Sequence, residues 1–156
     1  MKKIAFLVFF GILTVNAQPT ADSISEFDSA HVFRTVETQI RPELEGGMYK
    51  LSMYISQNVQ LPEVHNRKIS LFVSFIVEID GTLSDVNFIH LDIRKLYDQA
   101  DETFIDLNTT EMPIYDELKS AALNAITNFN GKWIPAQRDG VAVRCRFNYP
   151  IIINIE

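Results

Sequence analysis

The strongest constraint on the fold is an alternating apolar run in the middle of the chain, which is followed at once by a turn signal. Apolar residues occupy every second position, which is the period of a β-strand: Ile69, Leu71, Val73, Phe75, Val77 and Ile79. Phe72 and Ile76 add apolar side chains to the other face, which predicts a central strand. The pair Asp80-Gly81 is typical of a type I′ hairpin turn, and residues 83–91 are predicted to return as the paired strand.

Two segments have the apolar spacing of amphipathic helices. The first follows a turn at residues 42–47, ends near Asn58, and places one apolar face at Met48, Leu51, Tyr54 and Ile55. The second begins at Pro113, stops at Asn130-Gly131, and has an apolar face at Ile114, Leu118, Ala121, Ala125 and Phe129.

A last strand is predicted over residues 141–149, where Val141, Val143, Cys145, Phe147 and Tyr149 alternate with polar residues. Pro150 has no N–H to donate, which favours an edge position for this strand. The predicted fold is therefore α+β: a three-stranded antiparallel sheet with two helices packed on one face.

Residues 92–112 fit none of these elements. Ile93, Leu96 and Tyr97 have the spacing of a single helical turn, and the rest of the segment is mostly acidic and polar. We expect a long surface loop here, of a kind that is often functional or mobile.

The N-terminus has the form of an export signal. Lys2 and Lys3 precede an apolar run at residues 4–15, and Ala17 completes a small-residue cleavage site. We expect a signal peptide at residues 1–17, a flexible leader at residues 18–31 and one folded domain at residues 32–156. The alternative is an inner-membrane anchor through residues 4–15, a run shorter than the ~20 residues of a typical spanning helix.

The charge balance argues against two classes of partner. The formal net charge is −6, and no run of basic residues follows the N-terminus. The sequence therefore predicts binding neither to nucleic acid nor to an anionic membrane surface.

No catalytic or cofactor constellation stands out in the sequence. Cys145 is the only cysteine and alternates with core residues, which predicts an inert buried thiol. His90 and Asp92 could share one face of a strand, but two ligands do not make a metal site. We therefore expect no catalytic residues, no cofactor and no metal. Trp133, the single tryptophan, is expected in the core.

Taken together, these segments resemble the C-terminal domain of TonB over about residues 32–156. The N-terminal part of the resemblance lies in Val32-Phe33, Val36-Glu37, Pro42-Glu43, Gly46-Gly47-Met48, Leu51, Tyr54-Ile55, Asn58 and Pro62. The C-terminal part lies in Trp133-Ile134-Pro135-Ala136, Gly140, Val143, Phe147 and Pro150-Ile151, with the Asp80-Gly81 hairpin between the two parts. The chain departs from the family at residues 92–112, where the family has a short connection.

The resemblance implies a periplasmic, non-enzymatic domain that binds a protein partner by strand addition, such as an outer-membrane TonB-dependent receptor. We expect the partner alongside residues 141–149, with these residues in the partner-binding site: Gln137, Arg138, Arg144, Arg146 and Asn148. An exposed edge accepts any strand, so a homodimer fits it equally well. A small envelope enzyme is the remaining alternative.

Overall fold

The computed structural model describes residues 30–96 and 112–156. The predicted signal peptide, nearly all of the predicted leader and residues 97–111 lie outside these ranges. The elements, in chain order, are β1 (Phe33–Arg34), the 3-10 helix η1 (Thr35–Glu37), β2 (Glu43–Leu44), α1 (Tyr49–Asn58), β3 (Arg67–Val77), β4 (Leu83–Lys95), α2 (Met112–Thr127), β5 (Trp133–Ile134), β6 (Ala136–Arg138), β7 (Val141–Val143) and β8 (Cys145–Ile155).

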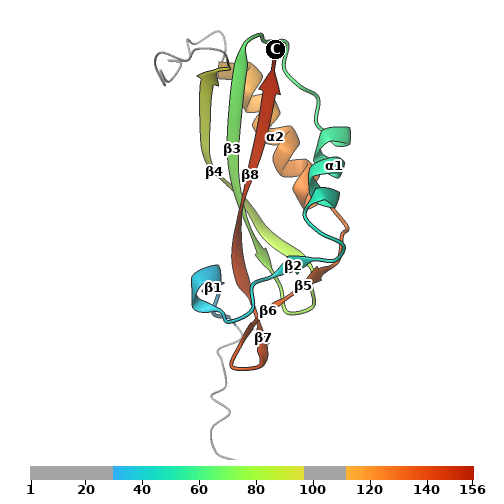
Figure 1. The fold of residues 1–156 in the computed structure, drawn as a ribbon, viewed down its shortest axis with the longest axis vertical. Helices are drawn as coiled ribbons and strands as arrows, with labels where there is room; N and C mark the ends of the chain where they lie inside the picture. The colour runs from blue at the N-terminus through green and yellow to red at the C-terminus, as the bar shows by residue number, and fades with distance from the viewer. Residues whose placement is uncertain (1–29, 97–111) are drawn as a thin grey trace, which may run out of the picture.

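The prediction that the alternating apolar run forms the central strand is confirmed. The main sheet has the order β1-β8-β3-β4, and β3 pairs antiparallel with both β4 and β8 (Figure 1). Five of the six alternating residues are fully buried: Ile69, Leu71, Val73, Phe75 and Val77. The sixth, Ile79, is 56% exposed because it lies in the turn beyond the strand.

The α+β class is confirmed, but the main sheet has four strands instead of three. β8, β3 and β4 form the expected antiparallel set, and β1 adds a short parallel pairing of Phe33 with Cys145 and Arg34 with Arg146. Two further two-stranded sheets, β2-β5 and β6-β7, lie below the two helices in the view of Figure 1. The pairing of β1 with β8 adds the segment around residue 33 to the main sheet.

The predicted strand at residues 141–149 is wrong in its extent. β7 pairs with β6 as a separate hairpin, and β8 starts only at Cys145. The chain leaves β7 at Arg144, whose carbonyl accepts a hydrogen bond from the Phe33 N–H at 2.9 Å. Pro150 lies in the middle of β8, opposite Phe72 of β3, and does not end the strand.

The type I′ turn occurs at a different hairpin from the predicted one. Between β6 and β7, Asp139 and Gly140 both have positive φ, at 51° and 78°, as a type I′ turn requires. Between β3 and β4 only Gly81 has positive φ, at 82°, and its N–H donates to the Glu78 carbonyl at 3.0 Å. This pattern indicates a three-residue loop that ends in a left-handed glycine.

β4 is longer than predicted, since it continues to Lys95. Ile93 lies in this strand opposite Ile69 and is 4% exposed. The prediction that Ile93 begins a helical turn is therefore wrong. The extension gives Ile93 a place in the core beside β3, which its helical spacing with Leu96 did not suggest.

Both helices lie on the same side of the sheet (Figure 1), and α1 agrees with the prediction in its bounds. α2 begins as predicted but ends at Thr127, before Phe129, and of its predicted apolar face only Leu118 and Ala125 are buried. One core cluster joins both helices to the buried face of β3, with Leu51 and Ile55 from α1, and Leu118 and Ile126 from α2. Trp133 is 1% exposed, as expected of a core residue. In the described ranges, no helix has both the length and the apolar character needed to cross a membrane.

Candidate partner-binding edge

The outer edge of β8 is open over most of its length. β3 pairs with one side of β8 through eleven consecutive residues, from Cys145 to Ile155. On the other side, within residues 30–96 and 112–156, only β1 pairs with β8, and it reaches only Cys145 and Arg146. The stretch from Phe147 to Ile155 is therefore a strand edge that no described strand covers.

The position of Pro150 shows which backbone groups point outward along this edge. Antiparallel strands bond through alternate residues, and a proline cannot donate to its neighbour. Since the register with β3 is unbroken at Pro150, the even-numbered residues are those that turn away from β3. The Arg144 carbonyl, which faces Phe33 on the outer side, fits the same alternation. The outward groups thus belong to Asn148, Ile152 and Asn154, with the carbonyl of Pro150.

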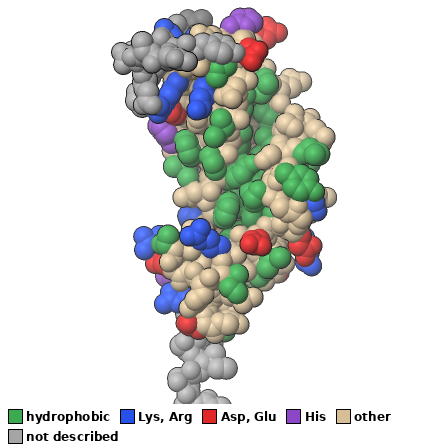
Figure 2. Space-filling view, viewed as in Figure 1, with side chains coloured by type: hydrophobic (Ala, Val, Ile, Leu, Met, Phe, Trp, Pro, Cys, Tyr) green, Lys and Arg blue, Asp and Glu red, His purple; other side chains and the backbone are tan. Residues whose placement is uncertain are grey.

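A groove of about 480 Å³ runs between this edge and α1. Its lining comes from α1 and the loop after it, and from the middle of β8: Ser52, Ile55, Ser56, Val59 and Leu61, then Tyr149, Pro150, Ile151, Ile152, Ile153 and Asn154. Figure 2 shows hydrophobic side chains gathered along the middle of this face, where the sheet meets α1. Leu61, which lines the groove, is 56% exposed, so apolar surface lies open beside the open strand.

None of the described residues that line the groove carries a charge. The polar side chains of these residues are uncharged, and two of them bond to each other: the Ser52 hydroxyl lies 2.7 Å from the Tyr149 hydroxyl. That bond joins α1 to β8 across the groove. The chemistry of the lining suits an uncharged, largely apolar occupant, because a charge placed there would lose its hydration without gaining a partner.

Two of the predicted site residues, Gln137 and Arg138, lie in β6 and away from the open edge. The backbone of Gln137 is fully engaged: its N–H donates to the Ile40 carbonyl, and its carbonyl accepts from Gln39 and Ile40. The Arg138 guanidinium lies 5.0 Å from the ring centroid of Phe33. These contacts fix the β6–β7 hairpin against the segment before β2 and leave no free strand edge at Gln137.

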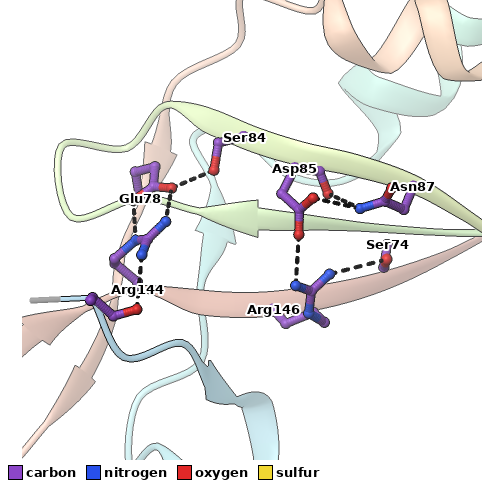
Figure 3. Close-up of polar contacts among 8 residues, drawn as sticks. Ser74, Glu78, Ser84, Asp85, Asn87, Arg144 and Arg146 are labelled. Atoms are coloured by element: carbon purple, nitrogen blue, oxygen red, sulfur yellow. Dashed lines mark hydrogen bonds and ion pairs between the residues drawn. The ribbon is translucent and has the colours of Figure 1, made fainter.

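Arg144 and Arg146 point at the β3–β4 hairpin and are paired within the chain (Figure 3). Arg144 donates to both carboxylate oxygens of Glu78, at 2.6 and 2.9 Å, and to the Ala30 carbonyl at 3.0 Å. Arg146 donates to Asp85 at 2.7 Å. Both guanidinium groups are thus paired with carboxylates of the same chain, and the place of Arg144 and Arg146 in the partner-binding site stays a prediction.

These pairings lower the pKa values of the Glu78 and Asp85 carboxyl groups. The hydrogen bond from Arg144 is the main cause that lowers the pKa of Glu78, and burial opposes it. The bond from Arg146 is likewise the main cause that lowers the pKa of Asp85. Ser84 also donates to Glu78, and Asn87 donates to Asp85 (Figure 3). The arginine pairs therefore fasten the hairpin to the start of β8.

Of the five predicted residues, Asn148 alone lies on the open edge, just beyond the part of β8 that β1 covers. The residues that sequence reasoning missed are those of the groove, from α1 and from β8 beyond Pro150. One signal was present: Tyr149, Ile151, Ile153 and Ile155 continue the apolar alternation past the proline. The side of α1 that lines the groove carries no comparable signal, because its nearness to β8 is a tertiary contact.

The other candidate residues have structural surroundings. Cys145 is fully buried, and its burial raises the pKa of the thiol to about 11, as expected of an inert cysteine. Asp92 accepts a hydrogen bond from Arg94 at 2.9 Å, and the His90 ring stacks on Phe72. No group of three potential metal ligands occurs among the described residues.

The chain matches no family model, and neither the curated proteins nor the solved structures that were compared with it include a match.

Proposed function

We propose that this chain is a non-enzymatic protein-binding domain that adds an extended segment of a partner protein to the outer edge of β8. The observation that carries the proposal is the open edge of β8 beside an uncharged apolar groove. In strand addition, backbone hydrogen bonds supply affinity and side-chain pockets supply selectivity. The edge offers the first and the groove offers the second.

The cellular setting of the proposal rests on the sequence. The signal-like N-terminus supports export to the periplasm, and the resemblance to the TonB C-terminal domain supports a partner in the outer membrane, such as a TonB-dependent receptor. The three antiparallel strands with both helices on one side of the sheet are consistent with that resemblance. The same resemblance supports a role in transport across the envelope.

Pro150 affects how a partner can bind. It removes one donor near the middle of the edge, a feature that natural sheets use to discourage unwanted pairing. A partner strand therefore gains its donors mainly from Ile152 and Asn154, with Asn148 on the far side of the proline. We expect a short added strand centred on the second half of β8.

The test compares two substitutions at one position. Ile152→Pro removes an outward N–H, whereas Ile152→Ala removes the side chain but keeps the N–H. A partner is recovered from envelope extract with the wild-type chain, and its affinity for each variant is measured beside thermal unfolding. We expect Ile152→Pro to bind at least about tenfold more weakly than Ile152→Ala, since lost backbone bonds in a partly desolvated site are costly.

Two results would change the proposal. If the proline and alanine variants stay folded and bind alike, the partner does not use the β8 backbone. If the wild-type chain elutes as a dimer that Ile152→Pro converts to a monomer, the edge pairs with a second copy of this chain instead of a partner.

A further inference from the structure

We infer that the added segment carries two uncharged apolar side chains, two residues apart, which lie opposite Ile151 and Ile153 and enter the groove beside α1. This inference rests on the proposed strand addition and specifies the chemistry of the segment that binds.

The alternation of β8 decides which side chains of a partner can reach the groove. The odd-numbered residues of β8 face the helices: Ile151 is part of the main core cluster, and Tyr149 and Ile153 pack against it. Side chains of directly paired residues lie on the same face of a sheet. Partner residues opposite Ile151 and Ile153 therefore turn toward α1, and the residue between them turns to the opposite face.

These two partner positions meet an apolar wall. Ile55 and Val59 lie on the α1 side of the groove, are 5% and 7% exposed, and form its floor, while the more exposed Leu61 lies at its margin. Each apolar side chain that enters gains by leaving water, at about 25 cal/mol per Å² of buried apolar surface. A carboxylate or ammonium group at the same position would find no charged residue among the described residues of the lining.

The intervening position meets different chemistry. Opposite Ile152, a partner side chain lies on the sheet face away from the helices, in a row that continues through Ser70 to Asp92. Ile152 itself is 59% exposed, and the row is partly polar. This position is therefore expected to accept a polar or charged residue. The partner segment then has an apolar residue opposite Ile151, a residue of any polarity opposite Ile152 and an apolar residue opposite Ile153.

Three synthetic peptides test the rule with the full chain. The first is a capped peptide in which valine and threonine alternate, with a lysine at each end and valines at both groove positions. The second replaces one valine with glutamate, and the third replaces the threonine between the valines with glutamate. Titration of each peptide is followed by fluorescence anisotropy and by hydrogen exchange of the Ile152 and Asn154 amides.

We expect the groove-glutamate peptide to bind at least about tenfold more weakly than the first peptide, as desolvation of an unpaired charge predicts. The peptide with glutamate at the intervening position should stay within about threefold of the first. The variant Leu61→Lys should reverse part of this discrimination by pairing with the glutamate in the groove. Ile79→Lys, at the equally exposed hairpin tip, is the matched control and should change nothing.

The outcomes separate the inference from the proposed function. If the valine peptide protects the Ile152 and Asn154 amides and the two glutamate peptides bind equally well, strand addition stands and the groove rule is wrong. If no peptide protects those amides, addition to the β8 edge is wrong as well.

Discussion

Arg144 and Glu78 form a two-pronged ion pair that ties β8 to the opposite hairpin, with Nε and Nη2 each donating to a different carboxylate oxygen at 2.6 and 2.9 Å. Their side chains are 27% and 19% exposed, so the pair is largely shielded from solvent. Bidentate arginine–carboxylate pairs are among the stronger side-chain hydrogen bonds. The pair joins residues far apart in sequence, and it holds the β3–β4 hairpin beside the start of the strand that offers the open edge.

Reversing the charge of Arg144 should destabilise the fold. Arg144→Glu would place two carboxylates side by side and remove the two arginine hydrogen bonds to Glu78, which is expected to lower the melting temperature by about 5 °C or more. The double variant Glu78→Arg with Arg144→Glu restores opposite charges and should recover part of the loss. Thermal unfolding of all three variants measures this coupling. Equal melting temperatures for wild type and Arg144→Glu would mean that the pair contributes nothing to stability.

The same pair should make stability depend on pH. A carboxylate whose pKa is lowered in the folded state stabilises that state fully above its ordinary pKa, of about 4.3 for glutamate, and the contribution is lost as the pH falls through the lower folded value. Glu78→Gln removes this dependence. The stability advantage of wild type over Glu78→Gln should therefore shrink between about pH 6 and about pH 3.

Urea unfolding at each pH measures that difference, and Glu63→Gln, on the exposed loop before β3, is the matched control. A gap between wild type and Glu78→Gln that stays constant or widens on acidification contradicts the assigned role of Arg144.

Phe75 should be the costliest single truncation in the central strand. It is fully buried, and its ring centroid lies 5.3 Å from that of Trp133 and 5.6 Å from that of Phe147. Phe75→Ala is expected to cost roughly 3–5 kcal/mol of unfolding free energy. Ile79→Ala, at the exposed turn, should fall within about 0.5 kcal/mol of wild type. A urea melt in which the two variants lose similar stability would show that the aromatic cluster does not anchor the core.

Local patterns predicted the elements of this fold better than their boundaries or their contacts. The period of β3 is a property of neighbouring residues, so its buried face could be predicted down to Val77. Ile79 continued the pattern but fell in the turn, because the hairpin closes through Gly81 and not through a two-residue loop. The break at Arg144 depends on the Phe33 N–H, which comes from the other end of the domain.

The candidate site shows the same limit. That the last strand lies at the sheet edge over most of its length, from Phe147 on, could be predicted from Pro150 and from the two-faced apolar pattern of β3. The predicted strand, however, stopped before Pro150. It therefore did not include Ile151–Ile153, which line the groove. The pairing of Arg144 with Glu78 and of Arg146 with Asp85 could not be predicted, because these carboxylates approach the arginines only once β3, β4 and β8 are in register.

Two turn glycines should respond differently to the same substitution. Gly81 and Gly140 have similar positive φ values, 82° and 78°, so alanine strains the backbone equally at both, by about 1–2 kcal/mol. A Cβ on Gly81 would also lie 2.2 Å from the Trp133 carbonyl oxygen, whereas a Cβ on Gly140 would meet no atom within 4 Å. The Gly81 carbonyl accepts from the Trp133 N–H at 3.2 Å, so relieving the clash would disturb this bond.

We therefore expect Gly81→Ala to lose clearly more unfolding free energy than Gly140→Ala, which carries the backbone strain alone and serves as the matched control. Since the clash pushes the hairpin tip off β5, Gly81→Ala should also speed amide exchange at Trp133, and Gly140→Ala should not. Urea melts and hydrogen exchange of both variants measure the two effects. Equal losses of stability with unchanged exchange at Trp133 would show that the close packing of the hairpin tip on β5 is not required by the fold.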